Sequence, residues 1–359
     1  MTPAPRSPRA GAVAPDASDT PAVTVVVCTF NGARTLPACL RALNRQSVAA
    51  AIQVVVVDDG SSDGSGELAE GLGAEVIVHK QNQGLSAARN SGIAAARAPV
   101  VAFTDDDCVP SLRWLESLLV CYERPEVAAV GGRVGISRVS TVVHRYLEEN
   151  NPLAPLELEL STSDALSYRL YLYALRMWCL RRPCGSRAVY SFPGANMSFR
   201  KELLESIGGF DPSVRFGGDD EFVCREIRAH YPEMVLWYEP AAEVYHDYEG
   251  TVRDVWRRNF AYGKAHARVY RQNPEQRWPI VFPVPLLAVA VAMLAHTTRR
   301  RVLGAVALQL LLPQGIRSAL QHRRVANLSF SLLRLIEETA HDAGMFAGLI
   351  GAPSRSVGR

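Results

Sequence analysis

Short apolar runs alternate with amphipathic stretches along the first 135 residues of the chain. Four runs suit strands, and these are Val23–Cys28, Ile52–Val57, Glu75–Val78 and Pro99–Phe103, of which the last suits a strand buried on both faces of a sheet. Helical spacing of apolar residues separates them, as in Thr35–Gln46, and a helix over Ser111–Glu123 precedes a further strand at Val127–Val130. Strands that alternate with helices in this way predict an α/β fold with a doubly wound, mainly parallel sheet.

Composition adds limits to this prediction. The chain has 359 residues, enough for one large α/β domain with an appendage. Its net charge of only +3, without a compact basic cluster that contains aromatic residues, argues against nucleic-acid binding. The seven cysteines include no C-x-x-C pair, so we expect reduced thiols in a cytosolic protein. The first twenty residues lack the apolar core of a signal peptide and are typical of a disordered tail.

Three adjacent carboxylates, Asp105, Asp106 and Asp107, directly follow the fourth apolar run. We expect them at the carboxyl end of a parallel strand, which is the edge where open α/β sheets bind their ligands. Neighbouring negative charges repel one another, and a cation relieves the repulsion. Carboxylate oxygens suit Mg²⁺ or Mn²⁺, and the spacing Asp105-x-Asp107 lets alternate side chains converge on one ion. The alternative is an acidic turn that caps the next helix.

A second acidic pair, Asp58-Asp59, ends the second predicted strand and points to the same edge of the sheet. A carboxylate in this position suits a ribose hydroxyl or a base N–H of a nucleotide. The alternative is a tight turn with a helix cap over residues 59–62. The first strand-to-helix turn, Thr29-Phe30-Asn31-Gly32, lacks the pattern G-x-G-x-x-G, which argues against a nicotinamide cofactor.

Seven short motifs follow one another along the chain. The first half contains Thr29-Phe30-Asn31, Val57–Asp63, Asn82–Gly92 and Phe103–Asp107. The second half contains Pro193–Arg200, Ile207–Asp211 and Gly217–Arg225. In this order they resemble the family 2 glycosyltransferases with the GT-A fold, and the last is similar to that family's G-E-D-x-D/E-L-x-x-R motif. The resemblance covers roughly Val23 to Arg271 and implies inverting transfer of a sugar from a nucleotide-sugar donor.

The resemblance implies a donor site in the first half of the chain. Asp59 would hold the base or ribose of the nucleotide, and Asp105 and Asp107 would be the D-x-D pair that holds ribose and metal. The implied donor-binding residues are Thr29, Asn31, Asp59, Arg89, Asp105 and Asp106.

The second half would supply the catalytic base and further substrate contacts. The resemblance implies that Asp219 takes the proton from the acceptor hydroxyl, or Asp220 if the motif is shifted by one residue. The Glu of the family motif is Gly218 here. His246 follows an expected strand at Ala242–Tyr245 and is either a structural residue or a third metal ligand. The same resemblance places Asn196, Glu221 and Arg225 among the substrate-binding residues.

The composition changes near the C-terminus. Ile280–Ala295 carries no charge, and Arg299–Arg301 separates it from the apolar run Val302–Leu312. Both runs are short for a spanning helix, and a tribasic turn between them suits the inner face of a cell membrane, so we expect a cytoplasmic protein held there. A buried helical hairpin is the alternative. Final and internal helices are expected over Leu328–Ile350 and Ser167–Arg182.

These observations predict three regions and one activity. Residues 1–21 would be a disordered tail, residues 22–272 a GT-A domain with a nucleotide-sugar half (22–135) and an acceptor half (136–272), and residues 273–359 an apolar, helical region. The predicted protein is a glycosyltransferase that uses a nucleotide-sugar donor and Mg²⁺ or Mn²⁺. Its acceptor would be a glycan, a lipid-linked molecule or a small molecule, in the synthesis of cell-surface polysaccharide, glycolipid or a related glycoconjugate.

Two alternatives stay open from the sequence. A nucleotidyltransferase acting on a sugar phosphate would use a similar sheet and metal, but it usually needs a Gly-rich, basic phosphate loop near the N-terminus, which this sequence lacks. A non-catalytic module that binds nucleotide sugars is favoured only by Gly218.

Overall fold

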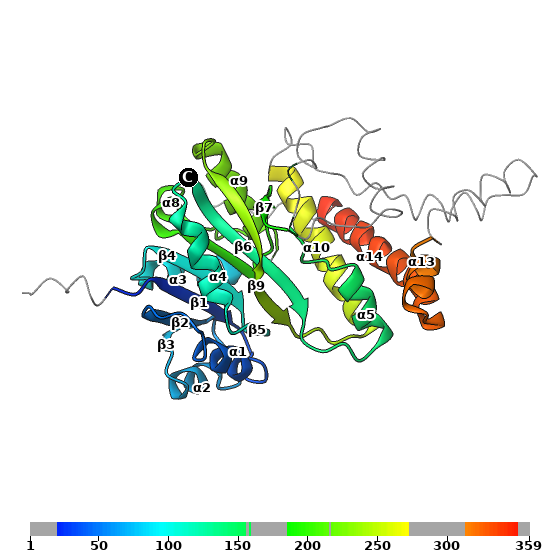
Figure 1. Ribbon diagram of the computed structural model, residues 1–359, viewed down its shortest axis with the longest axis horizontal. Helices are drawn as coiled ribbons and strands as arrows, with labels where there is room; N and C mark the ends of the chain where they lie inside the picture. Colours follow the sequence, from blue (N-terminus) through cyan, green and yellow to red (C-terminus); the bar gives the residue numbers. More distant parts are fainter. Residues whose placement is uncertain (1–19, 156–157, 159–184, 215–216, 273–312, 351–359) are drawn as a thin grey trace, which may run out of the picture.

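The computed structural model describes residues 20–155, 158, 185–214, 217–272 and 313–350 (Figure 1). Within these ranges a nine-stranded sheet has the order β3-β2-β1-β4-β8-β6-β9-β5, with β7 paired to β9. The strands are β1 (Val23–Thr29), β2 (Ile52–Asp58), β3 (Glu75–Val78), β4 (Val100–Asp105), β5 (Cys108–Pro110), β6 (Val127–Ile136), β7 (Arg187–Ala188), β8 (Asn196–Arg200) and β9 (Val235–His246).

Helices connect and flank these strands. The α-helices are α1 (Leu36–Leu43), α2 (Ser65–Gly71), α3 (Leu85–Ala95), α4 (Trp114–Leu119), α5 (Val142–Glu149), α8 (Lys201–Ser206), α9 (Asp219–His230), α10 (Val252–Gln272), α13 (Pro313–His322) and α14 (Phe330–Ile350). Two 3₁₀ helices, η1 (Val120–Glu123) and η2 (Val325–Ser329), extend α4 and precede α14.

The first half of the sheet is parallel, as the alternation of strands and helices predicts. β1 pairs in parallel with β2 and β4, and β2 pairs in parallel with β3. A parallel neighbour requires a crossover connection, which α1, α2 and α3 provide. Strands β1, β2 and β4 therefore all end at the same edge of the sheet.

The second half of the sheet is mixed. β8 runs antiparallel to both β4 and β6, and the short β5 runs antiparallel to β9, whereas β6 and β9 are parallel. Only two residues separate β4 from β5, too few for a crossover, so β5 leaves β4 and joins the last long strand instead. This pairing places Cys108 opposite His246.

Two hydrophobic cores cover the two faces of the sheet. Successive side chains of β1 point to opposite faces of the sheet. Val25 and Val27 belong to the core that contains residues of α1 and α4, whereas Val26 belongs to the core that contains residues of α3, α8 and α9. Trp114 in the first core and Phe103 in the second are among the largest fully buried side chains. The two layers of helices hold the sheet rigid, so the residues at its carboxyl edge have fixed positions.

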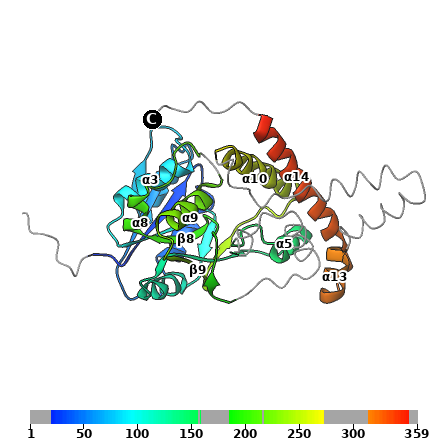
Figure 2. The same ribbon diagram turned by 90° about the horizontal axis from the view of Figure 1, so that it is seen from above.

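A third core joins the C-terminal helices to the sheet domain. It contains Tyr146 and Leu147 of α5, Val255 of α10, and Phe330 and Leu333 of α14. Helices α10 and α14 lie side by side in both views (Figures 1 and 2). The part of residues 273–359 that the structure describes therefore packs on the expected GT-A domain, and the division at residue 272 stays a prediction.

Several expectations fall outside the described residues. These are the tail up to residue 19, the helix over Ser167–Arg182 and both apolar runs between residues 280 and 312. None of the helices within the described ranges has the length and the apolar content needed to cross a membrane.

Candidate active site

A cavity of about 1030 Å³ lies at the carboxyl edge of the sheet. The ends of β1, β2 and β4, the start of α9, the end of β9 and one face of α10 contribute to its walls. The predicted site residues that line it are Thr29, Asp59, Arg89, Asp105, Asp106, Asp107, Asp219, Asp220, Glu221 and His246.

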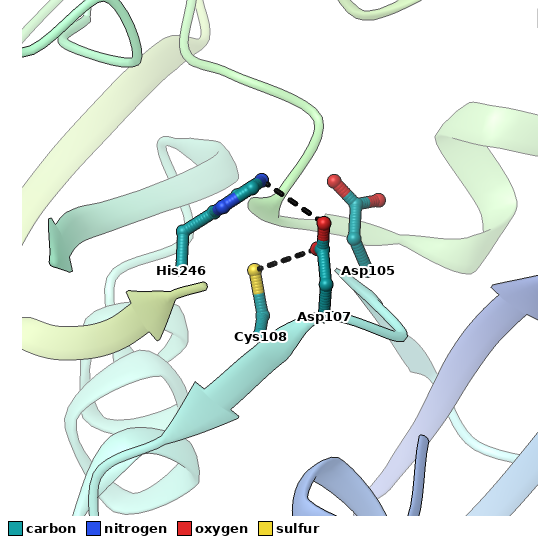
Figure 3. A group of neighbouring side chains, drawn as sticks. All are labelled: Asp105, Asp107, Cys108 and His246. Atoms are coloured by element: carbon teal, nitrogen blue, oxygen red, sulfur yellow. Dashed lines mark hydrogen bonds and ion pairs between the residues drawn. The ribbon is translucent and has the colours of Figure 1, made fainter. Parts of the chain in front are cut away.

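Three side chains of the cavity wall, those of Asp105, Asp107 and His246, converge with the buried side chain of Cys108 (Figure 3). Asp105, Asp107, Cys108 and His246 each offer one ligand atom, and these atoms all lie within 4.8 Å of one another. The Nε2 atom of His246 is 3.4 Å from a carboxylate oxygen of Asp107. The β4–β5 turn supplies the first three residues, and the pairing of β5 with β9 brings the histidine to them. The structure thus assembles the D-x-D pair and the predicted third ligand.

The electrostatics of this group suit a divalent cation. Burial raises the pKa of Asp107 to about 6 and that of Asp106 to about 7, and it also raises the pKa of Asp105. Burial lowers the pKa of His246 to about 4, so its ring is neutral and can act as a ligand at neutral pH. A bound cation would favour the ionised carboxylates and reverse their shifts. The donor set of two carboxylates and one imidazole fits Mn²⁺ or Mg²⁺.

Arg89 connects this cluster to α9. Its buried guanidinium forms an ion pair with Asp219, lies 3.5 Å from an oxygen of Asp105 and donates a hydrogen bond of 3.2 Å to the carbonyl oxygen of Gly194. A Cβ atom at Gly194 would lie only 2.6 Å from that guanidinium, so a glycine is required for this approach. Arg89 is thus held between Asp219, Asp105 and Gly194, and it also lines the cavity, where the resemblance implies a position near the nucleotide.

Asp219 and Asp220 begin α9, where the helix dipole favours negative charge. The residue before them, Gly218, has a φ of +83°, a conformation that favours glycine over the glutamate of the family motif. Asp220 accepts a 2.9 Å hydrogen bond from the backbone N–H of Gly194. Burial and the charge of Asp219 raise the pKa of Asp220 to about 6, and burial raises the pKa of Glu221 to about 8.

Asp59 is fixed at the end of β2. Its carboxylate accepts hydrogen bonds from the backbone N–H groups of Gln83 and Gly84, at 2.9 and 2.8 Å, and lies 2.7 Å from Nδ1 of His79. Three contacts leave room for a further donor, because an ionised carboxylate can accept about four hydrogen bonds. Asp59 can therefore still bind an N–H or O–H group in the cavity.

Three predicted substrate-binding residues do not line the cavity. Asn31 lies on the surface and accepts a hydrogen bond from the backbone of Ser62. Asn196 is fully buried, where its side chain bonds to Trp114 and to two backbone carbonyls. Arg225 pairs with the neighbouring Glu226. In these contacts Asn31 and Asn196 hold the local structure, and Arg225 is not among the residues that line the cavity.

Helix α10 supplies cavity residues that the sequence analysis did not include. Arg258 lies 4.2 Å above the ring of Tyr248, and this ring stacks at 4.2 Å on that of His246. The side chain of Arg258 is only 11% exposed, and its Nη2 atom lies 3.2 Å from Asp254 in an ion pair, whereas its buried Nε atom has no hydrogen-bond partner among the described residues. The sequence did contain a signal for these cavity residues: two adjacent arginines, 257 and 258, lie in an amphipathic helix that follows His246.

The fold and the sequence both resemble known proteins. The structure superposes on a mannosyltransferase from Pyrobaculum calidifontis, in complex with GDP-Man and Mn²⁺, with a TM-score of 0.53, 20% identity and coverage of 95% of this chain and 91% of that chain. The chain therefore has the GT-A fold. Residues 24–207 match the profile of glycosyl transferase family 2, and residues 181–347 match that of glycosyl transferase family 21. The chain belongs to glycosyl transferase family 2.

Curated relatives are similar over most of this chain. The pre-mycofactocin glycosyltransferase of Mycobacterium tuberculosis (strain ATCC 25618 / H37Rv) is 32% identical over 288 residues, which are 79% of this chain and 55% of that protein. Glycosyltransferase AglE of Haloferax volcanii is 27% identical over 222 residues, which are 60% of this chain and 64% of that protein. The chain thus spans about half to two thirds of the length of these relatives.

Proposed function

We propose that this protein transfers a sugar from a nucleoside-diphosphate sugar to an acceptor hydroxyl, with inversion at the anomeric carbon. One observation carries the proposal: ligand atoms of Asp105, Asp107 and His246 converge within 4.8 Å in a cavity that also contains the separate carboxylates of Asp219 and Asp220. Glycosyl transfer needs a cation for the leaving diphosphate and a base for the acceptor, and these two groups match the two needs. Membership of family 2 supports glycosyl transfer over nucleotidyl transfer.

Asp105, Asp107 and His246 would hold the metal, which we propose to be Mn²⁺ or Mg²⁺. When bound, this ion neutralises the negative charge that develops on the leaving diphosphate. Mn²⁺ is supported by its presence, with GDP-Man, in the mannosyltransferase of the same fold.

Arg258 would supply a second positive charge for the diphosphate. Most charges in the described cavity wall are carboxylates, and of its arginines Arg89 is held by Asp219. The buried Nε atom of Arg258 has no hydrogen-bond partner among the described residues, its Nη2 atom pairs with Asp254, and its guanidinium lies against the ring of Tyr248, which stacks on His246. A hydrogen bond from a guanidinium to a phosphate oxygen satisfies such atoms and is stronger than a neutral one.

Asp220 is better suited than Asp219 to take the proton of the acceptor hydroxyl. Asp219 is buried, and its carboxylate is already held by the guanidinium of Arg89. Asp220 also lines the cavity, and its pKa of about 6 is close to the pH at which a general base is most effective. A single base implies one in-line displacement, and therefore inversion.

The acceptor is proposed to be a glycan, a lipid-linked molecule or a small molecule, met at the cytoplasmic face of a membrane. Support comes from apolar side chains exposed on α13 and η2 next to two arginines: Leu320, Val325, Leu328, Arg323 and Arg324. A surface of this composition suits anionic lipid headgroups with adjacent acyl chains.

The test is donor binding with and without metal. Purified protein is screened by thermal unfolding against nucleoside-diphosphate sugars, each with Mn²⁺, with Mg²⁺ and with a chelator. A ligand at 100 times its Kd stabilises the folded state by about 2.7 kcal/mol. We expect stabilisation by at least one donor with metal and none with chelator, and Asp107→Ala should abolish it. Glu116→Gln on the exposed surface of α4 is the control. Metal-independent donor binding in Asp107→Ala would refute the proposed metal site.

A further inference from the structure

The fourth member of the metal cluster is a cysteine. Cys108 is fully buried, and its sulfur atom belongs to the group of ligand atoms that lie within 4.8 Å of one another. The sulfur lies 3.8 Å from an oxygen of Asp107 and points towards the same space as His246 (Figure 3). Neither Mn²⁺ nor Mg²⁺ needs a sulfur ligand, because both prefer oxygen and nitrogen donors.

The position of this sulfur follows from the fold. Cys108 begins β5 and pairs with His246 of β9, so the two side chains are held by the same ladder of backbone hydrogen bonds. Asp107 precedes Cys108 directly, and its backbone carbonyl accepts a 2.9 Å hydrogen bond from the N–H of Asp247. Both ends of the cluster are thus tied to the sheet, and the four ligands need little movement to close on one ion.

We propose that this cluster is also a site for a thiophilic divalent cation, Zn²⁺, with Cys108 as its fourth ligand. The proposal rests on the metal site of the proposed function. Two carboxylates, one imidazole and one thiolate match the tetrahedral coordination that Zn²⁺ prefers. The sulfur–zinc bond forms as the thiol proton leaves to solvent.

Zinc and manganese would have opposite effects on the site. With Asp105, Asp107 and His246 as ligands, a six-coordinate ion keeps open positions for diphosphate oxygens. With Cys108 as well, a tetrahedral ion has all four positions filled by the protein, as in structural zinc sites. Divalent-metal affinity generally rises from Mn²⁺ to Zn²⁺, and a thiolate increases the difference. Zinc should therefore bind tightly, displace manganese and exclude the donor.

Cobalt substitution tests the sulfur ligand directly. Co²⁺ bound to a thiolate has a charge-transfer absorption band in the near ultraviolet, which oxygen and nitrogen ligands alone do not produce. We expect this band in the wild-type protein, its loss in Cys108→Ser and its retention in Cys39→Ser. Cys39 is a matched control because it is fully buried nearby in α1 but is not one of the four clustered residues.

Zinc affinity gives a second measurement. Removing Cys108 should weaken Zn²⁺ binding by at least roughly 100-fold, since even the loss of an outer-shell partner costs about 10–100-fold. Mn²⁺-dependent donor binding should remain in Cys108→Ser and should lose its sensitivity to zinc. Thermal unfolding without metal shows whether the variant is folded, and Cys108→Ala replaces it if it is not.

An unchanged cobalt spectrum or an unchanged zinc affinity in a folded Cys108 variant would overturn the proposal. Its failure is distinguishable from failure of the proposed function. A cobalt–sulfur band without any metal-dependent donor binding would leave the zinc site standing and refute the transferase. Donor binding with Mn²⁺ but without a cobalt–sulfur band would support the transferase and refute the zinc site.

Discussion

Arg89 holds together two carboxylates that come from opposite halves of the chain. It forms an ion pair with Asp219 of α9 and lies 3.5 Å from Asp105 of the metal cluster. Because Arg89 and Asp219 are buried, removal of one partner leaves an uncompensated charge. Asp219 thus has a structural role, because it neutralises the buried charge of Arg89.

The two aspartates at the start of α9 should respond differently to substitution. Asp219→Asn should destabilise the protein by about 3–5 kcal/mol, because it leaves Arg89 without its main partner. Asp220→Asn should keep the wild-type unfolding temperature within a few degrees and lower the transfer rate by about 10²–10⁴-fold. Urea unfolding and steady-state kinetics measure both effects. A stable Asp219→Asn protein that has lost its activity, beside an active Asp220→Asn, would instead identify Asp219 as the base.

The pH dependence of transfer provides a check on Asp220. Burial raises its pKa from 3.8 to about 6, so the carboxyl group is protonated and inactive as a base below that pH. We expect kcat/KM to rise with pH through an apparent pKa near 6, and the residual activity of Asp220→Asn to lack this step. A wild-type profile that is flat between pH 5 and 7 would argue against Asp220 as the base.

Arg258→Gln should weaken nucleoside-diphosphate binding by roughly 10–100-fold, which corresponds to the loss of one hydrogen bond to a charged group. Binding of the matching nucleoside monophosphate, which has one phosphate fewer for Arg258 to contact, should change less. Calorimetric titration with Mn²⁺ present measures both. Arg253→Gln is the control, since Arg253 is exposed on the same helix and does not line the cavity. If both variants behave alike, the role assigned to Arg258 is wrong.

At the scale of elements, glycines set the distance between α10 and α14. A Cβ atom at Gly263 would lie 2.0 Å from the carbonyl oxygen of His341, and one at Gly344 would lie 2.1 Å from that of Phe260. The Nε2 atom of His341 also lies 2.7 Å from the Nδ1 atom of His266, and His266 lines the cavity. Helix α14 therefore supports the wall of the active site although it does not line the cavity.

Gly263→Ala and Gly344→Ala should each destabilise the protein by about 1–3 kcal/mol, because the added methyl group meets backbone atoms that cannot move independently. Both should also lower kcat/KM, since α10 carries Arg258 and His266 into the cavity. Gly71→Ala is the control, as nothing lies within 4 Å of a Cβ atom there, and it should be neutral or slightly stabilising. Urea unfolding of the three variants decides between these outcomes, and three similar proteins would refute the close packing.

At the scale of the whole molecule, the surface formed by α13 and η2 exposes several large apolar side chains. Leu320 and Val325 are 74% and 80% exposed, and Arg323 and Arg324 lie between them in sequence. The proposed attachment to a membrane depends on this surface of α13 and η2.

The protein should float with anionic lipid vesicles and much less with neutral ones. Each arginine near an anionic surface contributes about 1 kcal/mol, so Arg323→Glu with Arg324→Glu should reduce binding by at least roughly tenfold. Arg97→Glu, on a different part of the surface, removes a pair with Glu75 and serves as the control. Equal flotation with neutral vesicles, or an unaffected double variant, would contradict the electrostatic part of this attachment.

Local sequence determined the first half of the fold and located the candidate metal ligands in it. The alternation of apolar strands with helices predicted β1 to β4, because buried parallel strands and amphipathic helices have different periods. The end of β4 then located Asp105 and Asp107, since parallel strands end at one edge of a sheet. These features follow from the local periodicity of apolar residues, so they can be predicted from the sequence alone.

Only the tertiary structure decided which of the remaining candidates belong together. Asn31, Asn196 and Arg225 match family motifs but lie away from the cavity, whereas Cys108 and Arg258 match none and line the site or its metal cluster. Strand β5 is too short to be predicted, yet its pairing with β9 brings Cys108 to His246. Likewise, the charge of Arg89 distinguishes Asp219 from Asp220 across more than a hundred residues. Such contacts are set by the packing of distant elements, which no local pattern of residues encodes.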